Sequence, residues 1–228
     1  MKINSVFDVI GPVMVGPSSS HTAGAVRIGL ATHQILGGTP INASILLHGS
    51  FAETYQGHGT DKALVAGLLG LNTDDDRIVD AFELATQQGM HFKIDCVELG
   101  DEYHVNTAKL QVIGKEQAIE VIGSSIGGGN VIIVEINGFK TELMGDYNTI
   151  LIFHKDQQGV AAQVLTKLSH YGVNVAFMRL SRKAKGQEAF MAIEVDSTVS
   201  PTLLQDIATI PEISLVRLMS AISPAGGT

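Results

Sequence analysis

Apolar and small residues recur at helical spacing directly behind three consecutive serines near the start of the chain. Within residues 24–36 they lie at Ala25, Ile28, Gly29, Thr32, Ile35 and Leu36. Because side chains three, four and seven positions apart share one side of an α-helix, this segment is predicted to be helical. Two glycines and a proline within residues 37–40 end the predicted helix.

Short strands and helices follow in the first half of the chain. Residues 41–49 alternate apolar and polar side chains, as a strand with one buried face does. Segments 60–70 and 76–89 are predicted helices, and each ends on a glycine. Further strands are predicted at 91–99, at 103–114, and on both sides of a glycine-rich turn within 117–138. Because the helices come early and antiparallel-looking strands come late, the pattern predicts an α+β domain rather than a doubly wound sheet.

The pattern restarts after a polar stretch, so we place a domain boundary between Gly138 and Thr149. This boundary gives one domain over residues 1–143 and a second over residues 149–228. The second domain has predicted strands at 150–154, 173–181, 188–196 and 213–219, with helices starting near Val160 and Pro201. The order βαββαβ is that of a ferredoxin-like split βαβ unit.

Composition and charge exclude several classes of protein. The chain has 228 residues, of which 45% are hydrophobic and 17% charged, a globular rather than a disordered composition. The formal net charge of -8 argues against a nucleic-acid partner, and the basic residues at 179–185 are predicted to form a solvated turn. No apolar run approaches the roughly 18 residues of a membrane span, and no signal peptide is recognised. We therefore expect a cytoplasmic protein that does not bind membranes.

Cys96 is the only cysteine of the chain. A single thiol excludes an internal disulfide, and it excludes an iron–sulfur cluster held by this chain's own thiolates, since a cluster needs about three or four of them. We predict no metal site in this chain. Because Cys96 lies in a predicted strand, we expect its side chain to be buried as a small hydrophobe.

Hydroxyls and an imidazole gather directly before the first helix, at Ser18, Ser19, Ser20, His21 and Thr22. Three interpretations are open. The serines could cap the helix and satisfy one another locally. They could bind an anion, because the amides at a helix start are unpaired and carry positive partial charge. A Ser–His nucleophilic pair is disfavoured, since adjacent helical residues point in different directions and no nucleophile elbow surrounds the serines.

A second candidate is His58, which lies between Gly57 and Gly59 in what we predict to be a loop. The flanking glycines let the backbone approach another group closely, and a loop histidine there is well placed as a base. A plain surface histidine is the alternative. We expect Thr60 or Asp61 to cap the helix that follows.

The glycine-rich stretch 123–131 is the third candidate. Backbone N–H groups around Gly127, Gly128 and Asn130 could bind an anionic substrate group. The stretch lacks the lysine and the spacing of a P-loop, and it does not join a strand to a helix. A hairpin turn with a bulge is the interpretation that we favour for the stretch alone.

The second domain resembles an ACT domain, the amino-acid-binding regulatory module of metabolic enzymes, in the segments DQQGVAAQVLTKLSHYGVNVAFM and GQEAFMAIEVD. The resemblance implies an effector site at the first strand–helix junction, with Asp156, Gly159, Val160 and Asn174 as candidate residues. It also implies self-association, and some ACT domains only dimerise. Helix capping by Asp156 and Gly159 and a chain turn at Asn174 are the structural alternatives.

The whole chain resembles the beta chain of the iron–sulfur-dependent bacterial L-serine dehydratase. The motifs DVIGPVMVGPSSSHTAGAVRIG, GHGTDKA and SIGGGN occur in that order ahead of the ACT-like segment. The first domain is also similar to an allosteric substrate-binding domain inserted in some D-3-phosphoglycerate dehydrogenases. The resemblance implies conversion of L-serine to pyruvate and ammonia, a lyase reaction in which a [4Fe–4S] cluster acts as Lewis acid.

With one cysteine, this chain would need a separate, cysteine-bearing alpha chain to carry the cluster, and it would be inactive alone. The reaction needs a base at the substrate Cα, and we expect His58 to be that base because its glycine setting suits close approach. Thr60 or Asp61 could orient it, although a capping role explains these two residues nearly as well. Ser20 and His21 would bind the substrate carboxylate, with Ser18 and Ser19 as further candidates. Participation of a potassium ion stays open. The alternatives are a stand-alone amino-acid sensor that binds serine without a partner, and a subunit that serves assembly only.

Overall fold

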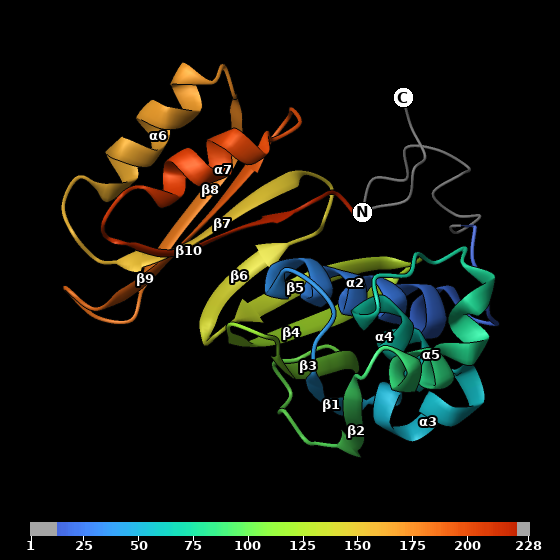
Figure 1. The fold of residues 1–228 in the computed structure, drawn as a ribbon. Coiled ribbons are helices and arrows are strands. Elements are labelled where there is room, and N and C mark those ends of the chain that lie inside the picture. Colours follow the sequence, from blue (N-terminus) through green and yellow to red (C-terminus); the bar gives the residue numbers. More distant parts are fainter. Residues whose placement is uncertain (1–12, 223–228) are drawn as a thin grey trace. The chain divides into compact units, whose positions relative to one another are not determined.

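The computed structural model describes residues 13–222, which divide into two compact units. The described part of the first unit contains residues 13–138, 142–144 and 222, and the second contains residues 139–141 and 145–221. Both units combine helices with a sheet, so the predicted α+β class is confirmed (Figure 1).

The first unit is built on a six-stranded sheet in the order β2-β1-β3-β4-β5-β6. The strands are β1 (Asn42–Gly49), β2 (His91–Cys96), β3 (Asn106–Ile113), β4 (Ala118–Gly127), β5 (Asn130–Ile136) and β6 (Phe139–Leu143). The central strands β1, β3, β4 and β5 pair antiparallel, as predicted. Strand β2 instead runs parallel to β1, with Asn42 opposite His91. The expectation of antiparallel strands was wrong for β2, because the helices between β1 and β2 return the chain in its original direction.

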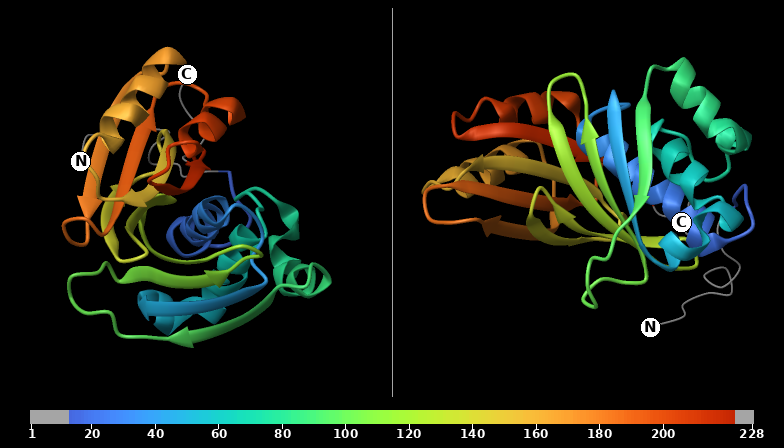
Figure 2. Two further views of the ribbon diagram at one scale, coloured as in Figure 1. Left: turned by 60° about the vertical axis from the view of Figure 1, so that its left-hand side comes forward. Right: turned by 90° about the horizontal axis from the view of Figure 1, so that it is seen from below.

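Helices of the first unit lie on one side of its sheet (Figure 2, right). They are the π-helix η1 (Ser19–Ala23), α2 (Gly24–Leu36), α3 (Ser50–His58), α4 (Thr60–Leu68), the 3-10 helix η2 (Asp76–Asp80) and α5 (Ala81–Gln87). Helices α2 and α4 touch backbone to backbone: a Cβ built on Gly67 would lie 2.1 Å from the Val26 carbonyl oxygen. Only glycine permits this approach, which fixes the first half of α2 against the C-terminal turns of α4.

Three local predictions were wrong. Residues 50–58 form helix α3 rather than a loop, because Phe51 is fully buried and Gly59, at φ 66°, terminates the helix. Residues 139–143 form strand β6, in which buried and exposed side chains alternate. The strand has only five residues and lies in a polar stretch, so its apolar pattern was not recognised in the sequence. Cys96 is exposed rather than buried, since it ends an edge strand whose sides are largely open.

The second unit has the predicted βαββαβ order, with a four-stranded sheet arranged β10-β7-β9-β8. Its elements are β7 (Asn148–Lys155), α6 (Val160–His170), β8 (Val175–Arg182), β9 (Glu188–Val195), α7 (Pro201–Ala208) and β10 (Ile213–Met219). Both helices contribute buried side chains to one core, including Val164 and Leu203, against Ile152 and Met191 of the sheet. Burial of this apolar surface is what holds the unit together.

Candidate functional site

The serine run forms a capped π-turn rather than a loop in front of the helix. The Ser18 hydroxyl accepts a hydrogen bond from the His21 backbone N–H at 3.1 Å, so capping is confirmed for this serine. The N–H groups of Thr22 and Ala23 both donate to the Ser18 carbonyl oxygen, at 2.9 and 3.3 Å. The wider turn alters the directions in which the following side chains project from the helix. Ser19 and Ser20 therefore lie inside the first turn and are half-buried.

His21 and His58 are brought together by this arrangement. Their ring centroids lie 4.7 Å apart, and the planes are tilted by 40°. The Thr22 hydroxyl donates to the His58 carbonyl oxygen at 3.0 Å, which ties the start of the first helix to the end of α3. Thr22 and His58 are 36 residues apart in the sequence, so the imidazole pair joins two distant segments of the chain.

The His21 ring is held on several sides. Its Nε2 lies 3.1 Å from the Ser50 hydroxyl, and its ring packs edge-on against Phe51 at 5.4 Å. Burial lowers the pKa of His21, and the neighbouring His58 lowers it further by charge repulsion. His21 is therefore neutral at pH 7, where it can accept or donate a hydrogen bond without carrying charge.

His58 is the less constrained of the two histidines. Its Nδ1 is buried and has no hydrogen-bond partner among residues 13–222. The side chain also lines a depression of ≈ 400 Å³ with five preceding residues of α3: Glu53, Thr54, Tyr55, Gln56 and Gly57. A buried ring nitrogen without a partner is costly, which suits a position whose partner is a ligand or another chain.

Thr60 and Asp61 do not cap α4. The cap position is Gly59, and no side chain accepts a hydrogen bond from the first turn there. The prediction of a side-chain cap was wrong because α3 and α4 join directly at this single glycine. Asp61 accepts from the Lys62 N–H at 2.8 Å, and the buried Thr60 hydroxyl has no partner within the described residues.

The glycine-rich stretch forms the expected hairpin turn with a bulge. Gly127 pairs with Asn130, and the register shifts between Ser125 and Gly127. The two turn residues, Gly128 and Gly129, have φ angles of 61° and 80°, and positive values at both positions define a type I′ turn. The sheet thus positions the turn, and its exposed residues Gly128 and Asn130 are open to a ligand.

Arg27 is a site residue that the sequence interpretation missed. The guanidinium, on a side chain 4% exposed, donates a hydrogen bond to the Gly129 carbonyl oxygen. This contact joins the first turn of α2 to the glycine turn across 102 residues of sequence. The available signal was a lone charged residue within an otherwise uncharged predicted helix, residues 24–36.

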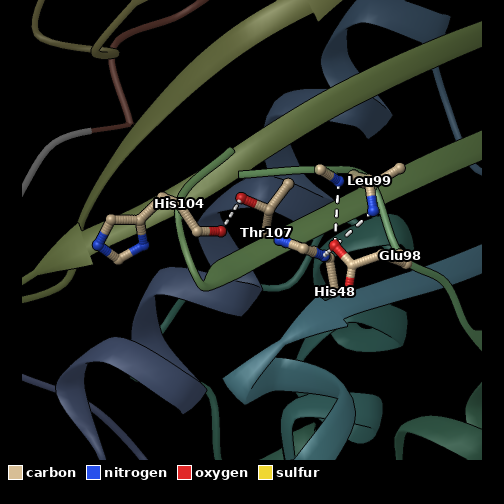
Figure 3. Close-up of polar contacts among 6 residues, drawn as sticks. His48, Glu98, Leu99, His104 and Thr107 are labelled. Atoms are coloured by element: carbon tan, nitrogen blue, oxygen red, sulfur yellow. Dashed lines mark hydrogen bonds and ion pairs between the residues drawn. The ribbon is translucent and has the colours of Figure 1, made fainter. Parts of the chain in front are cut away.

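His48 belongs to a separate cluster that fastens a loop to the sheet (Figure 3). Its buried ring accepts, at Nδ1, a hydrogen bond from the Leu99 N–H at 3.2 Å. The Glu98 carboxylate lies 3.4 Å from the same nitrogen, which cannot also donate to it while it accepts the backbone N–H. On the neighbouring strand, Thr107 donates to the His104 carbonyl oxygen at 2.6 Å. The cluster has a structural role and does not join the histidine pair.

The chain's own residues do not fit an iron–sulfur cluster. Cys96 is its only thiol. Among residues 13–222, no group of three or more histidine, cysteine, aspartate or glutamate side chains is arranged to hold a metal ion.

In the second unit, Asp156 is engaged by the β8–β9 hairpin. Its carboxylate accepts from the Gly186 N–H at 2.9 Å and from Arg182 at 3.0 Å. The backbone hydrogen bond and then the guanidinium lower the pKa of Asp156. Gly159 takes the cap position of α6 with φ 93°, directly before Val160, so Asp156 does not cap this helix.

Asn174 lies in the same unit as Asp156, just before β8. Its side-chain amide donates to Asp196 at 2.7 Å across the start of the β8–β9 pair. The residue therefore links two strand ends, and it also turns the chain after α6, as the structural alternative expects.

Two models of known protein families match this chain. Residues 5–135 match the model of the serine dehydratase beta chain family, and residues 148–212 match that of the ACT domain. The chain belongs to the serine dehydratase beta chain family. Both resemblances inferred from the sequence are thereby confirmed.

Two similar proteins align with this chain over most of its length and of their own. The chain is 44% identical to a probable L-serine dehydratase beta chain of Bacillus subtilis, over 93% of this chain and 96% of that one. It is 40% identical to the L-serine dehydratase beta chain of Peptoniphilus asaccharolyticus, over the same shares. A D-3-phosphoglycerate dehydrogenase of Bacillus subtilis is 30% identical over 69% of this chain but only 30% of its own length.

No helix formed by residues 13–222 has the length and apolar character needed to cross a membrane.

Proposed function

We propose that this chain is the beta subunit of a two-chain L-serine dehydratase that works in the cytoplasm. A cysteine-bearing alpha chain supplies the [4Fe–4S] cluster, and the present chain supplies protein groups around the substrate. The observation that carries the proposal is the paired histidines, His21 and His58, beside the serine turn in a chain whose relatives are L-serine dehydratase beta chains. Without the alpha chain we expect no turnover.

His58 acts as the base in this proposal. It takes the proton from the Cα of serine, the electron pair of that C–H bond forms the Cα=Cβ double bond, and the Cβ–O bond breaks. The proton that His58 has taken up returns to the departing hydroxide, which leaves as water. The resulting aminoacrylate gives pyruvate and ammonia by tautomerisation and hydrolysis. His58 is favoured over His21 because its Nδ1 has no partner, whereas both His21 nitrogens lie near hydroxyls. A neutral His21 also assists, since it does not repel the proton that His58 takes up. Within residues 13–222 neither Thr60 nor Asp61 forms a hydrogen bond with His58. In this proposal they act on His58 only indirectly, as the first two residues of α4.

The substrate carboxylate is bound by the serine turn on one side and the glycine turn on the other. Ser18 already accepts the His21 N–H, so Ser19 and Ser20 have the freer hydroxyls. Gly127, Gly128 and Asn130 offer the second set of polar groups. Carboxylates bind well at such places, because backbone amides of helix starts and glycine turns point outward there.

The ACT unit supplies regulation and self-association in this proposal, with domains at 1–143 and 149–228. An amino-acid effector would bind near Asp156, Gly159, Val160 and Asn174. Its ammonium group would share the Asp156 carboxylate with Arg182 or replace that guanidinium. The strands β8 and β10 form the edges of the four-stranded sheet, where a second copy can pair.

The base assignment is tested in the enzyme reconstituted from both chains. Replacing His58→Asn is expected to lower kcat by about two to four orders of magnitude, the usual contribution of a general base. An exposed histidine of the same unit, changed as His91→Asn, is the matched control and should leave kcat unchanged. If His58→Asn retains kcat within a few-fold of the control, His58 is not the base.

A further inference from the structure

Arg27 is a buried cation whose charge no acidic residue of the described chain balances. Burial is the cause that lowers the pKa of its guanidinium, with no contribution from a neighbouring carboxylate. The group stays charged nonetheless, because arginine starts from a very high pKa. Its recorded hydrogen bond goes to the backbone carbonyl oxygen of Gly129. Burying a guanidinium without a carboxylate partner is costly, so the hydrogen bond from Arg27 to the Gly129 carbonyl oxygen points to a specific structural role.

The Gly129 carbonyl oxygen, which accepts this hydrogen bond, lies in a turn of three consecutive glycines. The backbone of such a turn is poorly ordered unless other contacts hold it. Gly127, Gly128 and Gly129 follow one another with φ angles of 101°, 61° and 80°. Three glycines in a row have the largest conformational freedom that a chain offers, so ordering them is entropically costly. Gly129 is nevertheless buried, while Gly128 beside it is exposed. The Arg27 guanidinium therefore holds the turn from inside and leaves its outer residues open.

A second contact joins the same two elements. A Cβ built on Gly24 would lie only 2.2 Å from the Ser125 hydroxyl oxygen and 2.7 Å from the Ser125 Cβ. The end of β4 thus lies directly on the first turn of α2, three residues before Arg27 in the chain. Because η1 runs straight into α2, the glycine turn is fixed to the helix that carries Ser18 and His21 at its start.

We propose that Arg27 is a positioning residue for the dehydratase reaction. Through the Gly129 carbonyl it fixes the glycine turn to α2, so that the two groups of residues around the substrate carboxylate keep one geometry. The proposal rests on the proposed function, in which the serine turn and the glycine turn both bind that carboxylate. Arg27 itself does not touch the substrate. The hydrogen bond from a charged donor is strong enough for this task, since it is roughly twice as strong as one between neutral groups.

Hydrogen–deuterium exchange of the full chain tests the structural step. We expect Arg27→Met to speed the exchange of amides within residues 123–131 by about tenfold or more, as loss of a charge-assisted hydrogen bond implies. Arg27→Lys keeps the charge with fewer donors and should give an intermediate rate, so the test survives if the methionine variant folds poorly. The matched control is Thr32→Val, a buried site of the same helix whose hydroxyl, within residues 13–222, donates only to the Ile28 carbonyl oxygen. Unchanged exchange at 123–131 in both Arg27 variants, relative to Thr32→Val, overturns the proposal.

Kinetics of the reconstituted two-chain enzyme test the functional step. A misplaced turn weakens ground-state binding, so Arg27→Met should raise the KM for serine by about tenfold with a smaller change in kcat, and Arg27→Lys should recover part of that loss. If Arg27→Met speeds amide exchange at 123–131 but leaves the KM for serine unchanged, Arg27 is not a positioning residue for the reaction. The proposed function is unaffected by that result as long as the wild-type pair of chains turns over serine. If the wild-type pair does not turn over serine, the proposed function fails, and the exchange result still decides whether Arg27 fixes the turn.

Discussion

Helices α2 and α4, which follow the segments of His21 and His58, touch each other backbone to backbone, and Gly67 is where this contact is most sensitive. A Cβ at this position would lie 2.1 Å from the Val26 carbonyl oxygen and 2.6 Å from the Leu30 amide nitrogen. Both atoms belong to the backbone of α2, so no side-chain rotation relieves the clash. Gly67→Ala must therefore push the two helices apart.

The expected loss of stability follows from two opposing effects. Overpacking costs about 1–3 kcal/mol, and the upper end applies where the neighbour is backbone. Alanine regains about 1 kcal/mol over glycine through its higher helix propensity. We expect Gly67→Ala to lower the free energy of unfolding by about 2 kcal/mol net. At about 2–4 °C per kcal/mol for a chain of this size, the Tm of the first unit falls by roughly 4–8 °C.

Differential scanning calorimetry of the full chain measures this change, and Gly57→Ala is its control. Gly57 is also helical, but nothing lies within 4 Å of a Cβ built there. The control should therefore be neutral or gain up to about 1 kcal/mol. If Gly67→Ala is as stable as the control, the backbone contact at Gly67 is not what fixes α2 and α4 relative to each other.

Three further predictions concern single groups. Ser18→Ala removes the cap and should lower the free energy of unfolding by about 1 kcal/mol in a denaturant titration; an effect no larger than that of Ser19→Ala would contradict the capping role. The folded state lowers the pKa of His21 below 6.5, so the unfolded chain takes up this proton at a higher pH than the folded chain does. Stability should therefore decline towards acid pH, and less so in His21→Gln; parallel pH profiles of the two proteins would refute this. Asp156→Asn weakens an ion pair at the surface, so we expect only a small loss of stability, confined to the calorimetric transition of the second unit; a shift in the first unit's transition would contradict the contacts described.

Local patterns in the sequence predicted most of the fold. The helix behind the serines, the glycine hairpin and the βαββαβ unit follow from apolar periodicity and turn residues, which act over a few positions. Helix α3 was missed because its stability comes from tertiary burial of Phe51, while its composition is that of a loop. The direction of β2 depends on where the chain returns after three α-helices and one 3-10 helix, which no short segment of sequence encodes.

The candidate site was predictable residue by residue but not as an arrangement. The motifs drew attention to His21 and His58 separately. Their ring centroids come within 4.7 Å through contacts between distant segments, such as the hydrogen bond from the Thr22 hydroxyl to the His58 carbonyl oxygen, and through the close packing of α2 against α4 at Gly29 and Gly67. Of these two glycines only Gly29 belongs to a motif, and no motif shows which residue it packs against. Arg27 was missed because its role depends on a carbonyl group 102 residues away.

The most direct test of the central claim is serine turnover, measured under anaerobic conditions as pyruvate formation. It compares this chain alone, a cysteine-bearing alpha chain alone, and the two chains mixed. The account predicts pyruvate only from the mixture. Serine binding to this chain alone, with no turnover in any of the three samples, would contradict the account and identify an amino-acid sensor instead.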